Sequence, residues 1–285
     1  MSSGNLTSGL DTAEPARTVR SADGTTISYF TTGRGEPLIV VPGALSTAAK
    51  YASFAAALGQ THTVHTIERR GRGLSGPQGR DYGIVKECQD LVAVQEATKS
   101  ARIFGHSYGG LIALETARNR SAILKVAVYE PGVSVDGSIA MGWMAAYQRK
   151  LAEGKPLDAF ATFSVAAGPT RAQKTPIWLM KRLLPLFMGA QRRKQVFELL
   201  SANLLEHEVV GQLDNSYQNY AEISADVLVM YGGKSGLDWV ASATKALEAV
   251  IPSVAVQGFP RLDHFGPDEG GAIEVAQAVG RFFST

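Results

Sequence analysis

A serine between two glycines follows an apolar run near the middle of the chain, in the stretch IFGHSYGG at residues 103–110. The run before Ser107 reads as a strand, and GGLIALETARN after it reads as a helix. Glycines at 105 and 109 let the backbone turn there without a side-chain clash. Gly-x-Ser-x-Gly between a strand and a helix is typical of a hydroxyl held out as a nucleophile. We therefore predict that Ser107 is a nucleophile for acyl transfer, against the alternative of a plain glycine-rich turn.

A serine nucleophile needs a base that takes its proton, and an imidazole held by a carboxylate supplies one. His264 lies in RLDHFGP, in a loop between the last short strand and the last helix. This is the place in the order nucleophile, acid, histidine where the base is expected. We predict His264 as the base and a structural or pocket-lining place for His106.

Two carboxylates compete for the role of the acid that orients His264. Glu130 ends the apolar run VAVYEPG, where the following Pro131 restricts the backbone. Asp238 follows a later apolar run and can already belong to the next helix. We favour Glu130, because a carboxylate at the end of a buried strand is hard to explain as solvated surface, and keep Asp238 as the alternative acid. Asp263 points away from its neighbour if that loop is extended.

An oxyanion formed during acyl transfer is stabilised by backbone N–H groups. Tyr108 supplies one such group at the start of the helix after the serine, where N–H groups lack helical partners. Ala44, in PGALS after the apolar run LIVV, is predicted to supply the second, and Gly43 lets a substrate approach. The alternative for Pro42-Gly43 is a simple turn.

The elements that must position these residues alternate between strand and helix from residue 37 to residue 131. The Asp23-Gly24 pair before them predicts a hairpin. Strand-helix alternation indicates a parallel sheet covered on both faces. The alternation stops after Pro131, gives way to helical patterns, and resumes with the strand ADVLVMYGG. The predicted fold is α/β, a mostly parallel doubly wound sheet with an inserted all-helical cap.

The predicted domain limits follow from this interruption. Residues 1–15 are small and polar and are predicted to be a disordered tail. Residues 16–132 and 223–285 form the predicted core, and residues 133–222 form the predicted cap, or lid. The cap contains many large apolar side chains, most of them for packing and some to roof a pocket, and we expect changes at Trp143 or Trp178 to alter substrate choice. The large apolar residues are Met141, Trp143, Met144, Phe160, Phe163, Trp178, Met180, Phe187 and Met188.

Composition excludes several other classes of protein. The net charge is only +2, and the basic pairs at 181–182 and 192–194 read as solvent-facing sides of helices, so no nucleic-acid partner is expected. Cys88 is the single cysteine, and the five histidines lack metal-ligand spacing, so we expect no disulfide, no metal and no cofactor. The chain shows no secretory signal and no apolar run of membrane length, which predicts a cytoplasmic protein without a membrane partner.

The motifs GHSYGG, VVPGA and DHFGP, in this order of elements, resemble the α/β-hydrolase fold family over residues 30–283. The loop ERRGRGLSG at 68–76 is similar to a structural loop of that family, with Glu68 in place of an aspartate. Pro42 stands where many members have histidine. The resemblance places the acid in a Gly-x-x-Asp loop after the cap, where Ser235 stands here, or at the end of the strand before the cap, at Glu130.

The resemblance and the residues together predict a cofactor-independent serine hydrolase acting on a small carboxylic ester, thioester or lactone with an apolar part. A C–C bond hydrolase, an acyltransferase and a cofactor-free peroxidase-like enzyme would use the same three residues. A receptor with this fold and slow turnover is the alternative outside enzymes, because fold alone does not decide function.

Overall fold

The computed structural model describes residues 16–285, and the predicted tail at 1–15 lies outside them. Within residues 16–285, eight strands form one sheet in the order β1-β2-β4-β3-β5-β6-β7-β8. The strands β3 to β8 run parallel to one another, and β2 runs antiparallel to both of its neighbours, β1 and β4. The strands are β1 Arg17–Arg20, β2 Thr26–Thr32, β3 Glu36–Val41, β4 His62–Glu68, β5 Arg102–His106, β6 Lys125–Tyr129, β7 Asp226–Gly232 and β8 Val254–Phe259.

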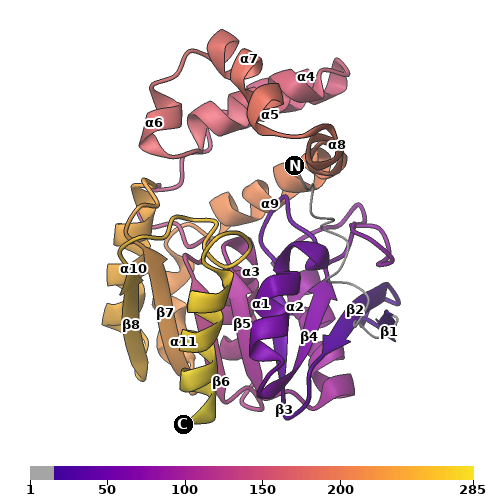
Figure 1. Cartoon of the computed structure of the whole chain (residues 1–285), viewed down its shortest axis with the longest axis vertical. Helices are drawn as coiled ribbons and strands as arrows, with labels where there is room; N and C mark the ends of the chain where they lie inside the picture. Colours follow the sequence, from indigo (N-terminus) through magenta and orange to yellow (C-terminus); the bar gives the residue numbers. More distant parts are fainter. Residues whose placement is uncertain (1–15) are drawn as a thin grey trace, which may run out of the picture.

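Helices cover both faces of this sheet (Figure 1). The helices α2, α3 and α10 pack on one face, and α1 and α11 pack on the other. The helices of the core are η1 Ala48–Tyr51, α1 Ala52–Leu58, α2 Ile84–Thr98, α3 Tyr108–Arg118, α10 Trp239–Val250 and α11 Ala272–Ser284. The prediction of a mostly parallel, doubly wound sheet is confirmed, including the antiparallel hairpin at its start.

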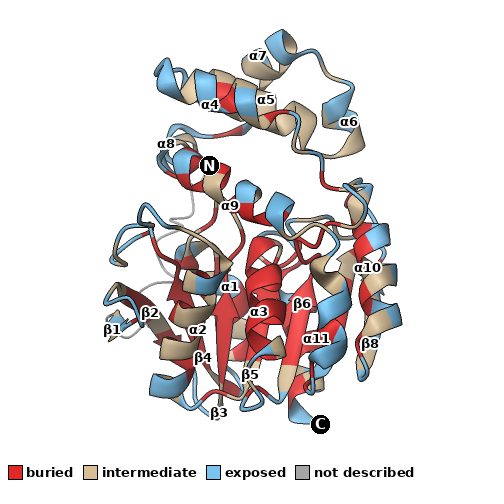
Figure 2. Ribbon diagram, turned by 180° about the vertical axis from the view of Figure 1, so that it is seen from behind, coloured by how far each residue is buried: buried red, intermediate tan, exposed pale blue. Residues whose placement is uncertain are grey.

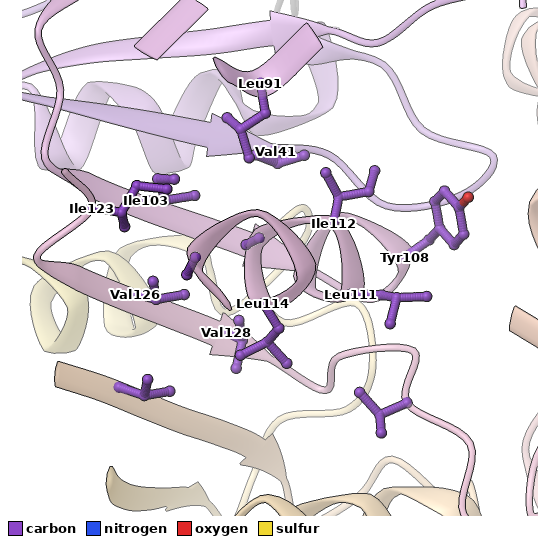
Figure 3. Packing of buried hydrophobic residues seen from close by; sticks show 14 of the residues in the cluster. Val41, Leu91, Ile103, Tyr108, Leu111, Ile112, Leu114, Ile123, Val126 and Val128 are labelled. Carbon is purple, nitrogen blue, oxygen red and sulfur yellow. The ribbon is translucent and has the colours of Figure 1, made fainter. Parts of the chain in front are cut away.

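Successive side chains of a strand point to opposite faces of the sheet, so each strand contributes to the core on both faces. In β3, Ile39 and Val41 join the cluster under α3, while Leu38 and Val40 join the cluster under α1 and α11. All four side chains are at most 1% exposed, as expected of a parallel strand covered on both sides. Figure 3 shows Leu111 and Leu114 of α3 beside Val128 of β6, so the helix that follows Ser107 is held against the centre of the sheet.

Helices α4 to α9, between β6 and β7, lie over the end of the core that carries Ser107 (Figure 1), whereas the last helix of this segment, η2, packs against α3 and α10. Figure 2 shows buried residues concentrated in the core, and mixed or exposed residues in these upper helices. Leu199 separates the two consecutive helices α8 and α9 of this segment. The helices are α4 Met144–Ala152, α5 Pro156–Ala166, α6 Thr170–Gln173, α7 Ile177–Phe187, α8 Ala190–Glu198, α9 Leu200–Gln212 and η2 Ser216–Glu222.

Candidate active site

Ser107 lies on a strained turn between β5 and α3. Its backbone has φ 53° and ψ −121°, a conformation that costs a non-glycine residue on the order of 1–3 kcal/mol. The glycines on both sides are required by close approach of the backbone. A Cβ atom on Gly105 would lie 2.4 Å from the carbonyl oxygen of Gly109, and one on Gly109 would lie 2.2 Å from that of Val41. The packing of the turn therefore explains the Gly-x-Ser-x-Gly spacing.

His264 lies in the loop between β8 and α11, and its ring joins Ser107 to Glu130. The Nε2 atom of His264 is 3.2 Å from Ser107 Oγ, and its Nδ1 atom is 2.7 Å from Glu130 Oε2. Because an ionised carboxylate only accepts hydrogen bonds, Nδ1 carries the hydrogen and Nε2 accepts from the serine hydroxyl. This direction of hydrogen bonding prepares Nε2 to take the serine proton.

Glu130 is held at the end of β6 by contacts with the neighbouring strand β7. Glu130 is 1% exposed, and its backbone has a φ angle of 41°. Oε1 accepts from the Gly232 amide at 2.8 Å, and Oε2 accepts from the Ser235 hydroxyl at 2.8 Å. Ser235 thus contacts the carboxylate from the position where the family resemblance offered an acid. Asp238 is exposed before α10, where Thr170 Oγ1 is 3.5 Å from its Oδ1.

Ala44 and Tyr108, whose amides are the two predicted oxyanion donors, line the same cavity as Ser107. Tyr108 is the first residue of α3, so helix geometry leaves its N–H without an intrahelical acceptor. Across residues 16–285, neither amide donates a hydrogen bond to protein. A Cβ on Gly43 would come within 3.2 Å of Ser107 Cβ, so a glycine there keeps the two segments close.

His106 connects the loop after β3 to the loop of His264. The Gly43 amide donates to the Tyr51 hydroxyl at 3.2 Å, and that hydroxyl lies 2.6 Å from His106 Nδ1. His106 Nε2 lies 2.8 Å from the carbonyl oxygen of His264, which only accepts. Nε2 therefore carries the hydrogen and Nδ1 accepts from Tyr51. Burial lowers the pKa of His106 well below its usual value, and the nearby His264 lowers it further. A neutral His106 thus takes the structural place predicted for it.

Arg69 holds the same loop from the other side. Its Nη1 donates to the carbonyl oxygens of Pro42 and Gly43 at 3.4 and 3.2 Å. Its Nη2 pairs with Glu87 of α2 at 2.7 Å and with Glu206 of α9 at 2.8 Å, and all three side chains are at most 2% exposed. Burial opposes the charge on Arg69, but Glu206 and Glu87 hold its pKa well above the usual value. The ion pairs therefore tie the loop of the predicted oxyanion donor to helix α9.

A cavity of about 350 Å³ opens beside Ser107 and His264, between the core and the helices above it. Most of its large side chains are apolar, which suits an apolar part of a small ligand. Neither Trp143 nor Trp178, where we expect changes to alter substrate choice, lines this cavity. Trp143 is buried against Tyr147 in the interior of the helical segment, and Trp178 is 63% exposed to solvent. The large apolar side chains at the cavity include Phe160, Phe163, Met180, Met188, Trp239 and Phe265.

Several polar residues at the cavity were not singled out from the sequence. Arg192, interpreted as part of a solvent-facing pair, is half-exposed and also lines the cavity. His207 lines it from α9, where Nδ1 is 2.9 Å from the Asn203 carbonyl oxygen, and burial lowers its pKa. Their local sequence carries no signal of a cavity, because only the packing of the helical segment brings them there. The remaining polar side chains include Ser46, Lys50 and Asp268.

Residues 16–285 contain no group of three or more His, Cys, Asp or Glu side chains that could hold a metal ion. No helix within the same residues has the length and apolar character needed to cross a membrane. Cys88 is half-buried on α2, and burial raises the pKa of its thiol to about 12, which disfavours the reactive thiolate.

Parts of the chain are similar to two curated proteins. A region of 110 residues is 34% identical to N-formylmaleamate deformylase of Pseudomonas putida strain KT2440, covering 37% of this chain and 41% of that protein. Another region of 131 residues is 29% identical to cis-3-alkyl-4-alkyloxetan-2-one decarboxylase of Shewanella oneidensis strain MR-1, covering 43% of this chain and 41% of that protein. The chain thus matches about two fifths of the length of these curated relatives.

A solved structure is similar over nearly the whole chain. The crystal structure of an alpha/beta hydrolase from Sphaerobacter thermophilus DSM 20745 is 30% identical, with a TM-score of 0.80, covering 94% of this chain and 100% of that one. A model of the alpha/beta hydrolase family matches residues 38–278, which include the serine turn and the histidine loop. The expectation of a hydrolase is confirmed at this level: the chain belongs to the alpha/beta hydrolase family.

Proposed function

We propose that the protein hydrolyses a small carboxylic ester, thioester or lactone through an acyl-enzyme on Ser107. The observation that carries this proposal is the line of hydrogen bonds from Ser107 Oγ through His264 to Glu130, open to an apolar cavity. A buried carboxylate, an imidazole in one tautomer and a serine on a strained turn are the parts that acyl transfer needs.

In the first half of the proposed reaction, the Ser107 hydroxyl attacks the carbonyl carbon while His264 Nε2 takes its proton. The carbonyl oxygen becomes an oxyanion beside the amides of Ala44 and Tyr108. When the tetrahedral intermediate collapses, the bond to the leaving oxygen breaks, and His264 passes the proton to that oxygen so that the neutral alcohol departs. Glu130 stabilises the positive charge that His264 carries between these two transfers.

In the second half, water attacks the acyl group on Ser107 and gives a proton to His264. Collapse of the second intermediate releases the carboxylic acid, and the proton passes to the serine oxygen. The two donor amides act again on the second oxyanion, and they need no rearrangement because helix α3 and the loop after β3 already hold them. The cycle regenerates the enzyme without an added cofactor.

The cavity supports a small substrate with an apolar part, since its volume of about 350 Å³ is near the lower end of ligand pockets. The helical segment at residues 133–222, proposed as a lid, supplies much of the apolar wall through α5 and α7. We propose that these helices select the length of the acyl or alkyl chain.

Labelling with a fluorophosphonate tests the proposal directly, together with turnover of p-nitrophenyl and thioester substrates of increasing chain length. The wild type should be labelled, and Ser107→Ala should not be labelled and should lose turnover by a factor on the order of 10⁴ or more. Equal labelling of both proteins would exclude Ser107 as the nucleophile. Labelling together with tight ligand binding but no turnover of any substrate would favour the receptor alternative.

A second candidate is hydrolysis of an N-formyl bond, and the region 34% identical to N-formylmaleamate deformylase favours it. The same serine, histidine and carboxylate serve this reaction, with nitrogen instead of oxygen in the leaving group. A comparison of formyl amides with formyl esters separates the two. Faster release of formate from the amide than from the ester would favour the second candidate.

A further inference from the structure

The outer face of helix α7 exposes large apolar side chains. Nine large apolar side chains are exposed among residues 16–285, and four of them lie in this one helix: Ile177, Trp178, Leu186 and Phe187. Leu186 and Phe187 have the largest exposed fractions of the nine, 78% each, and Trp178 is 63% exposed. Figures 1 and 2 show α7 at the outer edge of the molecule, on the side of the helical segment away from the sheet. Apolar side chains gathered on one exposed element mark a surface for a protein or membrane partner.

The spacing along α7 separates this outer face from the inner side of the same helix. Trp178, Arg182 and Leu186 recur every four residues, which places them on one face. Met180 and Leu184 lie on the opposite side, where Met180 lines the cavity and Leu184 packs against the apolar cluster inside the helical segment. The inner side of α7 is therefore used for packing, while nothing within residues 16–285 covers the outer face.

The charge around this helix has a single sign. Residues 170–197, from α6 into α8, contain seven Lys and Arg residues and no Asp or Glu, a formal charge of +7 in a chain whose net charge is +2. Lys181 and Arg192 pair with carboxylates of other segments, those of Asp158 and Glu269. In the described part of the chain, no ion pair involves four further exposed side chains, those of Arg171, Lys174, Arg182 and Lys194. The segment therefore presents positive charge beside apolar side chains.

The combination of apolar side chains and positive charge distinguishes the possible partners. In a symmetric dimer built on this face, the same patch would meet itself, and the positive charges of the two copies would repel each other. Nucleic acid would attract the Lys and Arg residues but would offer no apolar environment to Leu186. A membrane with anionic lipids offers both, since its headgroups attract Lys and Arg while Trp, Phe and Leu enter the boundary between headgroups and acyl chains.

We propose that the outer face of α7 binds the surface of a membrane that contains anionic lipids, with Trp178, Leu186 and Phe187 inserted at the headgroup boundary. A helix that lies in the plane of the membrane needs an apolar face and does not need the length of a spanning helix. The proposal thus differs from our expectation of no membrane partner, which followed from the lack of an apolar run of membrane length. It is independent of the proposed function, because it concerns the side of α7 opposite to the cavity.

Co-sedimentation of the purified full chain with vesicles measures this binding. One set of vesicles contains equal parts of phosphatidylglycerol and phosphatidylcholine, and the other contains phosphatidylcholine alone. We expect the wild type to bind the anionic vesicles about tenfold more tightly or better, and added salt to weaken this binding. Leu186→Ser should weaken it by about tenfold and Arg182→Gln by about fivefold.

Leu124→Ser and Arg281→Gln are the matched controls, because they make the same chemical changes at other exposed positions. Leu124 is 62% exposed and directly precedes β6, and Arg281 lies near the end of α11, at the end of the core away from α7 (Figure 1). Both variants should bind the anionic vesicles as the wild type does. Circular dichroism of each variant verifies that the fold is retained.

Quenching of tryptophan emission by lipids with bromine on their acyl chains separates insertion from attraction by charge alone. Trp178→Phe keeps an apolar ring at this position, so it should still bind the anionic vesicles but lose most of the quenching. The reason is that Trp143 is buried and Trp239 lies at the cavity.

The proposal is wrong if the wild type binds anionic vesicles no more tightly than neutral ones, or if Leu186→Ser binds them as tightly as Leu124→Ser. Binding that salt abolishes and that leaves Trp178 unquenched would show attraction to polyanions only and would overturn the inserted face. Self-association in analytical ultracentrifugation that Leu186→Ser abolishes, without vesicle binding, would assign the face to a second copy of the chain instead.

Discussion

At the carboxyl edge of the sheet, Ser107 and Glu130 both have positive φ angles, and neighbouring strands and helices surround them closely. The helices α6 and α7, which cover the same cavity, contain no buried residue. In the first region, strained backbone, close backbone contacts and hydrogen bonds fix the side chains. In the second region, the apolar side chains are only partly buried. The difference shows that the tightest packing of this fold lies where the reacting atoms must be placed accurately. The helical segment at residues 133–222, called the cover from here on, is packed more loosely.

One helix of the cover does not follow this contrast. The Glu206 side chain of α9 is 0% exposed and accepts from Arg69 and from Arg72, which is also 0% exposed in its side chain. Arg72 Nε in turn donates to the carbonyl oxygen of Ser46, in the loop after β3. The ion pairs thus anchor α9 to the loop that contains Ala44, the predicted oxyanion donor, and the contrast applies to helices α6 and α7.

The largest effect that tests the contrast is expected at Glu130. In Glu130→Gln, an amide replaces the carboxylate and no longer stabilises a charged His264, so kcat should fall by about 10⁴ while the fold persists. Asp238→Asn is the control at the exposed acid and should remain close to wild type. Steady-state kinetics of both variants at matched stability provide the measurement. A near-normal Glu130→Gln together with an inactive Asp238→Asn would transfer the role to Asp238.

A second change asks whether the serine turn tolerates one added methyl group. In Gly109→Ala, the new Cβ would lie 2.2 Å from the carbonyl oxygen of Val41 and 2.6 Å from that of Pro42, and neither backbone can retreat easily. We expect a loss of about 3 kcal/mol in the free energy of unfolding, measured with urea by circular dichroism. Gly142→Ala, in the segment before α4, is the control because nothing lies within 4 Å of its added Cβ. Equal stability of the two variants would remove the contrast in packing.

A third test compares a buried carboxylate of the core with an exposed one of the cover. Glu68 is 5% exposed, and burial raises its pKa to about 6, above its unfolded value, so its ionisation destabilises the folded state as the pH rises through this range. Between pH 4.5 and 8, the wild type should lose about 2 kcal/mol of stability relative to Glu68→Gln.

Glu153 of the cover provides the matched comparison for Glu68. Hydrogen bonds from Lys155 and Lys150 lower the pKa of this exposed carboxylate. A carboxylate with a lowered pKa affects stability in the opposite direction. It stabilises the folded state at neutral pH, and this stabilisation is lost as the pH falls. Glu153→Gln should therefore change the pH dependence only slightly, since solvent screens an exposed pair. Urea unfolding at a series of pH values measures both effects, and parallel curves for wild type and Glu68→Gln would contradict the first.

The smallest effect is expected from the cover itself. Phe163 lines the cavity, so Phe163→Ala should enlarge it and shift the preferred p-nitrophenyl ester toward longer acyl chains, by about tenfold in the ratio of kcat/KM values. Trp178→Ala is the control, since that side chain is 63% exposed and does not line the cavity. An unchanged chain-length profile in Phe163→Ala would mean that Phe163 of α5 does not contact the substrate.

The sequence by itself determined the features that depend on a few neighbouring residues. The turn at Ser107 is readable because its steric demand for Gly105 and Gly109 is local, and the strand-helix alternation is readable because buried parallel strands require apolar runs. The family followed from these motifs and their order, and the family match confirms it.

Only the tertiary structure decided which side chains meet in space. The pairing of β6 with β7 brings Ser235 onto Glu130, and the loop after β8 places His264 on the same carboxylate, although 134 residues separate histidine and acid. Asp238 remains apart because the chain has already turned into α10. The lining of the cavity by Asp268 likewise depends on contacts between distant elements, and local residue preferences carry no information about such contacts.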